Sequence, residues 1–491
     1  MIQSHRYIIS IVSLSSSLLF AENSLPRQTL KTNGQIIYNV KQKKVSTLKD
    51  MLNQGELFGR LRSNNFYYIF DHDDTSHQTS AAASVGASFV YKSASLKGIE
   101  FNVGLYGSQA FFNPNEFDNN IKLLKSAKDT FSRYNYVKTG SKALYTFAQA
   151  NINYNYSKTD FTLGRQLVET FYTKSNDTKM IPNTFDALVV HSKDISKTEL
   201  KIAYMAKEKL RDHESSHSLL MYDDSDLANY SMWRGNDDSA MHKGLSYTNL
   251  KAAGKSTDAP LIIFDLTNRT LKNLKINFSA YNVPTLLSQV MGELNYNINF
   301  HNFTLTPGVR YIQQFDNGAG SVGGASLLGD VNENNPGGYK DPNSLNGKMI
   351  ALRLVAKLRD YKINIAYTDI LDQGDLVTPW RGFPTAGYTR SMGIYNWRAN
   401  SQSYRIELVK GSNSKGLYLK PFIQASVLYV NMDENKGILQ DSIMYYLGLV
   451  QNVPSMHSLQ YKLRLGHRDF IGAAADVSDY TDARCELNYL F

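Results

Sequence analysis

The chain ends in DARCELNYLF, residues 482–491, and this stretch alternates in the way that a β-strand does. The apolar positions on one face are Ala483, Cys485, Leu487, Tyr489 and Phe491. The polar positions on the other face are Arg484, Glu486 and Asn488. A soluble sheet could also bury the first face and hydrate the second, so the rest of the chain must decide between a soluble and a membrane fold.

The same alternation, in segments of about ten residues, recurs through most of the chain. It predicts strands near 54–70, 79–92, 97–111, 142–156, 159–168, 186–195, 198–211, 260–269, 273–284, 287–300, 303–316, 347–360, 361–371, 400–411, 419–431, 442–452, 457–470 and 481–491. These make about eighteen strands, an even number, as bacterial barrels require. The sequence therefore predicts an all-β fold, a transmembrane antiparallel β-barrel with apolar side chains toward lipid and polar ones toward a lumen.

The connections between these segments alternate between short and long. Tight turns are expected at 93–96, 157–158, 196–197, 270–272, 301–302 and 412–416, and long loops at 112–141, 169–185, 212–259, 317–346 and 372–399. Barrels have short periplasmic turns and long external loops, whereas a β-sandwich has no reason to segregate its loops by length. One link breaks the rule, because 284–286 is short although it should be external.

Residues 1–21 have the form of a secretory signal, with Arg6 followed by an apolar stretch and a small residue before ENS. We expect cleavage after Ala21. Residues 22–53 are polar and basic, with a short helix near 46–52, and are interpreted as a periplasmic extension or, as an alternative, a piece tucked into the lumen. Residues 54–491 form the barrel domain. No later run reaches the ~20 apolar residues of a spanning helix.

The composition agrees with an exported membrane protein. The chain of 491 residues is 42% hydrophobic and contains 32 Tyr and 23 Phe, residues that suit the aromatic girdles of a barrel. Its single cysteine, Cys485, excludes an internal disulfide. The formal net charge is +9, and export argues against nucleic acid as the partner of this basic chain.

Basic side chains share the polar face of several predicted strands. They are Arg60, Arg62, Arg310, Arg353, Lys357, Arg405, Lys462, Arg464 and Arg468. A charge facing lipid at mid-bilayer costs about 2–4 kcal/mol, so these cations should face the lumen. A wall of cations would guide anionic or carboxylate-bearing solutes. The alternative is a hydrated interior whose cations are balanced locally by Asp and Glu.

The third long external connection contains VETFYTKSNDTKMIPNTFDALVV at 168–190. Asp177, Lys179 and Pro182 lie in its middle. Opposite charges beside a residue with a fixed φ suit a stiff loop that folds inward and narrows a pore, as the third loop of porins does. The alternative is an ordinary surface loop.

Four stretches together resemble the OprD-type family of substrate-specific outer-membrane porins. They are GRLRSNNFYYIF at 59–70, GRQ at 164–166, SNDTKMIPNTFDAL at 175–188 and ELNYLF at 486–491. The resemblance extends over about 54–491, and PWRGFPTAGYTRSMGIYNW at 379–397 is similar to the ε-proteobacterial branch.

This resemblance implies a passive channel of 18 strands in the outer membrane of a Gram-negative cell. It implies an eyelet carrying Asp177, Lys179 and Pro182, and a basic ladder that conducts small carboxylates such as amino acids. The ladder would comprise Arg310, Arg353, Lys357, Arg405 and Arg464, and also Arg60 and Arg62. Arg165 fits poorly, because it shares the parity of Phe161 and Leu163.

No motif predicts an enzyme, a cofactor or a metal site. DHDD at 71–74 is interpreted as a solvated turn, and 330–341 lacks two defining residues of a calcium loop. The predicted partners are small hydrophilic solutes and outer-membrane lipid, with no nucleic acid, and the assembly is a monomer or a loose homotrimer. The competing hypothesis is an adhesin or receptor that binds through the 212–259 loop on a structural barrel.

Overall fold

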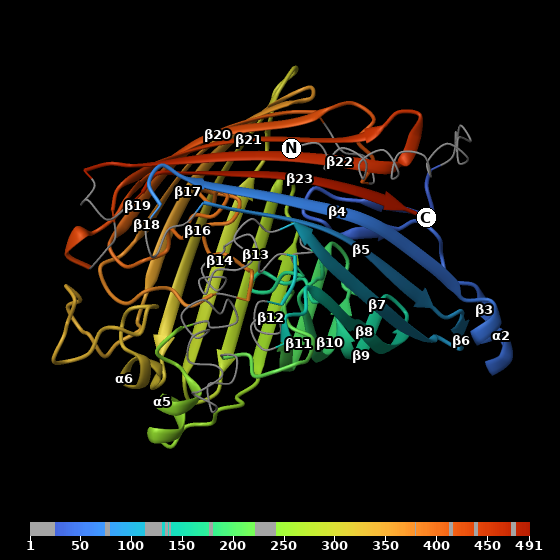
Figure 1. Ribbon diagram of the computed structural model, residues 1–491, viewed down its shortest axis with the longest axis horizontal. Coiled ribbons are helices and arrows are strands. Elements are labelled where there is room, and N and C mark those ends of the chain that lie inside the picture. The colour runs from blue at the N-terminus through green and yellow to red at the C-terminus, as the bar shows by residue number, and fades with distance from the viewer. Residues whose placement is uncertain are drawn as a thin grey trace.

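A closed antiparallel β-barrel of 18 long strands forms the body of the molecule (Figure 1). The computed structural model describes residues 25–73, 79–112, 130–132, 136, 139–175, 180–220, 242–378, 380–411, 416–436, 440–472 and 478–491. The long strands are β4 (Glu56–Phe70), β5 (Ser80–Lys92), β7 (Ile99–Phe112), β8 (Ala143–Tyr156), β9 (Thr159–Gln166), β10 (Thr184–Ser192), β11 (Thr198–Lys209), β12 (Leu261–Asn268), β13 (Leu274–Val283), β14 (Leu287–Tyr296), β16 (Thr304–Asp316), β17 (Lys348–Leu358), β18 (Tyr361–Ile370), β19 (Ser401–Lys410), β20 (Phe422–Asn431), β21 (Ser442–Val453), β22 (Met456–Phe470) and β23 (Tyr480–Leu490).

The remaining described elements are short. Three small strands extend the barrel, namely β3 (Lys44–Val45), β6 (Ser95–Leu96) and β15 (Ile298–Asn299), and β1 (Gln28–Leu30) pairs with β2 (Ile36–Tyr38) in a separate hairpin. The helices are α2 (Leu48–Asn53), α5 (Tyr247–Ala252), α6 (Ala319–Gly323) and the 3-10 helix η4 (Glu434–Lys436). Among the described residues, no helix has the length and apolar character needed to cross a membrane.

The first and last long strands close the barrel. β23 pairs with β4 in antiparallel register, from Tyr480 opposite Phe70 to Leu490 opposite Arg60. At the end of this seam the amide of Gly59 donates to the carbonyl of Phe491 at 2.8 Å, and the amide of Phe491 donates back at 3.0 Å. Every strand edge of the ring is therefore paired, which hydrocarbon requires because it offers the backbone no hydrogen bonds.

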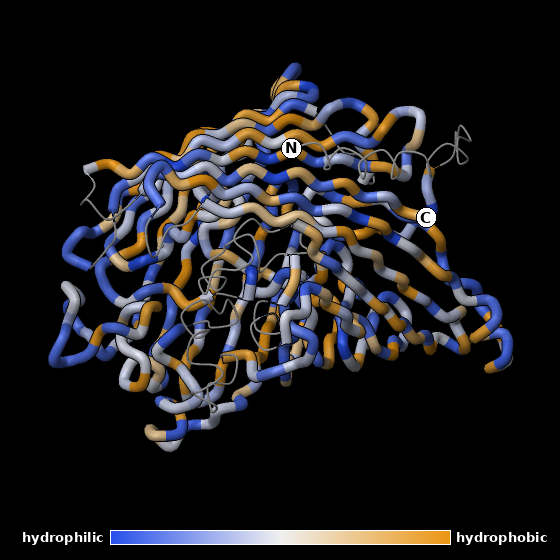
Figure 2. Tube along the Cα trace, in the orientation of Figure 1, coloured by the Kyte–Doolittle hydropathy of each residue, from blue (hydrophilic) through white to orange (hydrophobic). Residues whose placement is uncertain are grey.

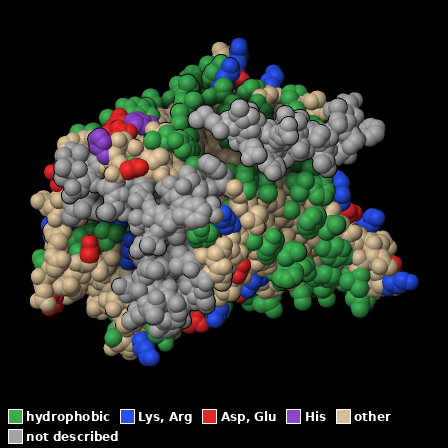
Figure 3. Space-filling view, in the orientation of Figure 1, with side chains coloured by type: hydrophobic (Ala, Val, Ile, Leu, Met, Phe, Trp, Pro, Cys, Tyr) green, Lys and Arg blue, Asp and Glu red, His purple; other side chains and the backbone are tan. Residues whose placement is uncertain are grey.

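The strands alternate in hydropathy along their length (Figure 2). On β22, Leu463 and Leu465 are 43% and 46% exposed on the outer surface, whereas Lys462 is 7% exposed on the inner one. Figure 3 shows hydrophobic side chains gathered over the outer surface of the strands, with many Lys and Arg side chains toward the ends of the molecule. The predicted parity of lipid-facing and lumen-facing residues is thus confirmed.

Short turns gather at one end of the barrel, and long loops at the other. Ser157 and Arg359, in the turns after β8 and β17, have φ of 56° and 53°, the left-handed backbone typical of tight hairpins. The short link after β13 is also present, with Thr285 at φ 63°. In Figure 1, α2, β3 and β6 lie at the end with the C-terminus, and α5 and α6 lie at the opposite one.

The described part of the N-terminal segment is anchored to the barrel. Thr47 caps α2 by accepting a hydrogen bond from the amide of Asp50, so the helix begins two residues later than the sequence predicted. The β1–β2 hairpin contacts lumen-facing side chains of β22 and both strands of the seam. This part of the predicted periplasmic extension therefore lies within the end of the barrel. The predicted signal, residues 1–21, lies outside the described residues.

Candidate functional site

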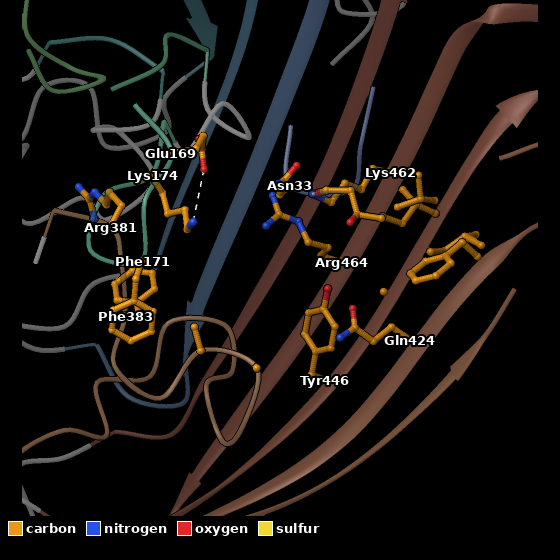
Figure 4. A pocket seen from close by; sticks show the side chains of 18 of the residues that line it. Asn33, Glu169, Phe171, Lys174, Arg381, Phe383, Gln424, Tyr446, Lys462 and Arg464 are labelled. Atoms are coloured by element: carbon orange, nitrogen blue, oxygen red, sulfur yellow. Dashed lines mark hydrogen bonds and ion pairs between the residues drawn. The ribbon is translucent and has the colours of Figure 1, made fainter. Parts of the chain in front are cut away.

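A cavity of about 620 Å³ lies in the lumen where five parts of the chain converge. The loop between β9 and β10 and the loop between β18 and β19 line one side, and the wall of β20, β21 and β22 lines the other (Figure 4). A residue of β16 and the tip of the β1–β2 hairpin complete it. The lining residues are Thr32, Asn33, Glu169, Phe171, Lys174, Arg310, Arg381, Phe383, Ala386, Gly387, Phe422, Gln424, Tyr446, Gly448, Leu449, Val450, Lys462, Leu463 and Arg464.

Two cations of β22 form the basic part of the wall. Both point inward because they alternate with the apolar residues that face outward. Lys462 donates through Nζ to the carbonyl oxygen of Thr32 at 2.6 Å and lies 3.9 Å from Glu486 Oε1. Arg464 pairs with the same Glu486 through Nη2. Glu486 therefore balances part of this charge without itself lining the cavity.

Arg310 joins the barrel wall to the loop between β18 and β19. Its guanidinium pairs with Glu293 at 2.5 Å, and its Nη1 donates to the carbonyls of Pro384 at 2.7 Å and Ala386 at 2.8 Å. The same guanidinium lies 4.9 Å and 4.5 Å from the ring centroids of Phe171 and Tyr388. This buried cation is therefore largely committed to holding the loop inside the lumen.

Arg353 supports the same loop from the next strand. Its Nη1 donates to the carbonyl of Gly387 at 2.9 Å, and its guanidinium lies 4.7 Å from the ring centroid of Tyr388. Its Nη2 donates to Asn295 Oδ1 at 2.5 Å. Burial also lowers the pKa of Arg390, on this loop, to about 10, and Arg390 stacks 4.2 Å from the ring centroid of Phe383. The loop thus rests on Arg353 and carries a buried guanidinium of its own.

The two inward loops are joined to each other through their backbones. The amide of Lys174 donates to the carbonyl of Trp380, and the amide of Gly382 donates to the carbonyl of Tyr172, both at 3.0 Å. A Cβ at position 382 would lie 2.2 Å from the carbonyl oxygen of Phe171, so only glycine permits this approach. The loops therefore form one unit on that side of the cavity.

The described part of the loop between β9 and β10 presents its own pair of charges. Glu169 Oε1 accepts hydrogen bonds from the amide of Ser175 at 2.8 Å and from its hydroxyl at 2.5 Å. Lys174 Nζ lies 3.6 Å from Glu169 Oε2 and donates to the carbonyl of Thr170 at 2.6 Å. Both side chains line the cavity, and Figure 4 shows them across from Asn33 and Arg464.

Of the three residues predicted for the eyelet, only Pro182 lies in the part of the chain that the structure describes. Asp177 and Lys179 are outside the described residues. Pro182 is buried, and its carbonyl accepts a hydrogen bond from Lys209 Nζ at 3.3 Å, but Pro182 does not line the cavity. The charges brought to the cavity from this loop are Glu169 and Lys174. The sequence showed these two residues in the same inward loop but gave no reason to choose them.

Three of the nine predicted wall residues, Arg310, Lys462 and Arg464, line the cavity. Three others donate hydrogen bonds to polar groups: Arg60 to Asn488 Oδ1, Arg62 to the carbonyl of Met180, and Arg468 to the hydroxyl of Ser442. Arg405 pairs with Glu407. Arg353 supports the loop as described, and Lys357 is exposed near the short-turn end, opposite Lys362. The local neutralisation weighed as the alternative thus applies to several of them.

Arg165 departs from the strand alternation for a local reason. Gly164 before it has φ of 114°, and the facing strand β10 has a bulge between Asp186 and Ala187. Arg165 Nε pairs with Asp186 at 2.7 Å, and its Nη2 donates to the hydroxyl of Ser216 at 2.6 Å. The left-handed backbone of Gly164 is thus the local irregularity directly before Arg165, while the register of β9 with β10 and with β8 is continuous.

Sequence reasoning missed several residues of the cavity. Arg381 and Phe383 come from the loop between β18 and β19, and Thr32 and Asn33 come from the N-terminal segment. In the described ranges, no group of three or more His, Cys, Asp or Glu side chains is placed to hold a metal ion. The arrangement is that of a cavity with charged and aromatic walls.

The lining carries more positive than negative charge. Five cations, Lys174, Arg310, Arg381, Lys462 and Arg464, face the cavity together with one carboxylate, Glu169. Two further carboxylates, Glu293 and Glu486, pair with these cations from behind the surface. The named groups therefore sum to a formal net charge of +2.

The chain is similar to known proteins both in sequence and in fold. The family model described as outer membrane porin, OprD family, matches residues 59–335. Among solved structures, OccAB1 of Acinetobacter baumannii is 13% identical, with a TM-score of 0.66 over 91% of this chain and 98% of that one. OccAB4 of the same organism is 14% identical, with a TM-score of 0.64 over 89% and 98%.

A third similar structure is OpdK of Pseudomonas aeruginosa with vanillate, 11% identical, with a TM-score of 0.64 over 90% of this chain and 99% of that one. No curated protein sequence matches significantly. The solved structures, all below 25% identity, support the fold, and the family model covers more than half of the chain. The chain belongs to the OprD family of outer-membrane porins, passive channels for small solutes rather than enzymes.

Proposed function

We propose that this outer-membrane channel favours small anionic solutes, above all those that carry a carboxylate. The observation that carries the proposal is the lining of the lumenal cavity, in which five cations face one carboxylate. A carboxylate can accept hydrogen bonds from ammonium and guanidinium groups there. Because two acidic side chains already engage part of this charge, each cation would hold a solute weakly enough to release it, as conduction requires.

The path we propose runs from the long loops to the short turns. A solute enters beside the joined loops and passes Lys174 and Arg381. It then exchanges water for contacts with Lys462 and Arg464 on the opposite wall. No step requires an input of energy, because the driving force is the concentration gradient.

The aromatic rings around the cavity favour solutes that also have an apolar part. Phe171 and Phe383 line the side made by the loops, and Tyr446 lines the opposite wall. The similar structure of OpdK was solved with vanillate, an aromatic carboxylate. By this likeness we propose that small aromatic acids are among the anions that pass, alongside aliphatic carboxylates such as amino acids.

The charge preference can be measured as a reversal potential across planar bilayers in a KCl gradient. We expect the wild type to favour Cl⁻ over K⁺, and Lys462→Gln with Arg464→Gln to reduce that preference severalfold. Lys158→Gln with Lys197→Gln is the matched control, because both lysines lie at short turns away from the cavity. Cation selectivity in the wild type would exclude the proposal.

The solute class can be measured by uptake into liposomes. Gluconate should enter faster than sorbitol, a neutral polyol with the same number of carbon atoms that lipid excludes, and the double substitution should remove the difference. If channels with defined conductance levels never formed, the barrel would instead have to be a support for binding through its loops, as the adhesin hypothesis holds.

A further inference from the structure

The N-terminal hairpin is an ordered element of the lumen with its own turn. β1 and β2 pair in register from Gln28 opposite Tyr38 to Leu30 opposite Ile36. The turn is closed by the amide of Gly34, which donates to the carbonyl of Lys31 at 2.9 Å, and Gly34 adopts φ of 83°. Leu30 is buried. The position of the tip is therefore set by the fold.

Hydrogen bonds fix this hairpin to the wall near the short-turn end. Gln460 Nε2, on β22, donates to the carbonyl of Leu30 at 2.9 Å. Gln28 Nε2 donates to the carbonyls of Gly59 at 2.5 Å and Phe491 at 3.0 Å. Gln28 and Gln460 are 2% and 1% exposed, so solvent competes little for these bonds.

The tip of the hairpin reaches the cavity from the end opposite the long loops. Thr32 and Asn33 line it, and Figure 4 shows Asn33 beside Lys462 and Arg464, facing Glu169 and Lys174. The carbonyl of Thr32 accepts the hydrogen bond from Lys462 Nζ at 2.6 Å. The amide of Thr32 donates to Tyr418 Oη at 3.3 Å. Two elements thus enter the barrel from its two ends and bound the same space.

We propose that the hairpin tip, Thr32 and Asn33, forms the inner half of the constriction and sets how strongly Lys462 holds a passing anion. In the empty channel the Thr32 carbonyl is the acceptor for the Lys462 ammonium. An arriving carboxylate is a stronger acceptor than a carbonyl and takes over this hydrogen bond.

When the solute moves on, the carbonyl returns, so the lysine is never left without an acceptor in a confined space. The exchange keeps the net binding energy small, because one hydrogen bond replaces another. Asn33, which is exposed beside this lysine, narrows the passage and adds a neutral polar contact. This inference rests on the proposed function, since it concerns the same anion path.

Charged substitutions at Asn33 test whether the hairpin tip bounds the path of the anion. Asn33→Asp should lower the Cl⁻ to K⁺ permeability ratio severalfold, and Asn33→Lys should raise it, in the same KCl-gradient recordings. Gln35→Asp and Gln35→Lys are matched controls on the same hairpin, because Gln35 does not line the cavity. The inference is overturned if the two Asn33 variants shift the ratio no more than the two Gln35 variants do.

Failure of the hairpin assignment can be told apart from failure of the proposed function. A wild-type channel that prefers cations would exclude the anion path, whatever the variants do. A wild type that prefers anions, with Asn33 variants that match their controls, would overturn only the role of the hairpin.

A chemical modification provides a second measurement that does not depend on the selectivity of the variants. In a Cys485→Ser background, Asn33→Cys introduces one thiol at the tip. The anionic reagent MTSES should then cause a stepwise fall in conductance, faster when added at the short-turn side. Gln35→Cys in the same background should label without that fall. Labelling of the Asn33→Cys variant confirmed by mass, with the conductance unchanged, would overturn the inference.

Discussion

Replacing Arg310 by Met should release the loop between β18 and β19 from the barrel wall. The substitution removes two hydrogen bonds, to the carbonyls of Pro384 and Ala386, and the ion pair with Glu293. Removing one partner of a buried ion pair costs about 3–5 kcal/mol. Arg353 Nη2 remains 3.6 Å from Glu293 Oε1, so part of the compensation survives and we expect the lower end, about 3 kcal/mol.

This loss should appear in the docking of the loop rather than in the strands, whose pairing is made by the backbone. Since every 1.4 kcal/mol is about tenfold in an equilibrium constant, the released population should rise on the order of a hundredfold. The amide of Gly382, bonded to the carbonyl of Tyr172, reports docking through hydrogen exchange. Its exchange should accelerate by that factor, and single-channel recordings should show a larger and noisier open level.

The double variant Arg310→Met with Glu293→Leu is the matched control. Replacing both members of a buried pair by apolar residues is often neutral for stability. The resistance of the barrel to thermal unfolding should therefore equal that of the wild type, while exchange at Gly382 stays fast because the carbonyls of Pro384 and Ala386 still lack their donor. If Arg310→Met alone leaves both the exchange rate and the conductance level as in the wild type, the assignment of Arg310 as the anchor is refuted.

Two other parts of the molecule make separate predictions. On the lipid-facing side of β22, Leu463→Arg should lower the free energy of unfolding in liposomes by about 2–4 kcal/mol. The matched control, Leu463→Met, should lower it by less than about 1.5 kcal/mol. Equal values for the two variants would contradict the outward orientation of Leu463. In the loop before α5, burial lowers the pKa of His242 to about 4, and its neutral ring accepts from the amide of Gly244 and contacts the carbonyl of Gly324. Because the pKa of His242 is lower in the folded protein than in the unfolded chain, its contribution to docking of the loop is complete above pH 6.5. Up to about 3 kcal/mol of docking free energy is lost as the pH falls toward 4. Hydrogen exchange at the amide of Lys243, which donates to the carbonyl of Leu327, would measure this loss. His242→Asn, which offers a neutral donor and acceptor, should flatten that pH dependence, and an unchanged profile would exclude His242 as its source.

The sequence predicted the barrel well because strand parity is a local property. An apolar residue such as Leu463 and a cation such as Lys462 must face opposite sides wherever the strand sits in the membrane. All 18 strands were therefore located to within a few residues from alternation and loop length alone.

The site was harder to predict because its residues meet through contacts between distant segments. Parity placed Arg310 in the lumen, but only the fold shows that Glu293 and the carbonyls of another loop engage it. Lys174 is positioned at the cavity by a hydrogen bond from its backbone amide to the carbonyl of Trp380, in the other inward loop. The approach of Thr32 to Lys462 joins residues 430 positions apart, and no local pattern records it.

The contact of Gln28 with both strands of the seam has a consequence for assembly. Its side-chain amide reaches the carbonyl of Gly59 on the first long strand and that of Phe491 at the last residue of the chain. The hairpin can therefore take its final position only after the two terminal strands have met. Docking of the hairpin therefore depends on complete closure of the ring. A perturbation at Phe491 should displace the hairpin at the end of the pore as well as the terminal strand.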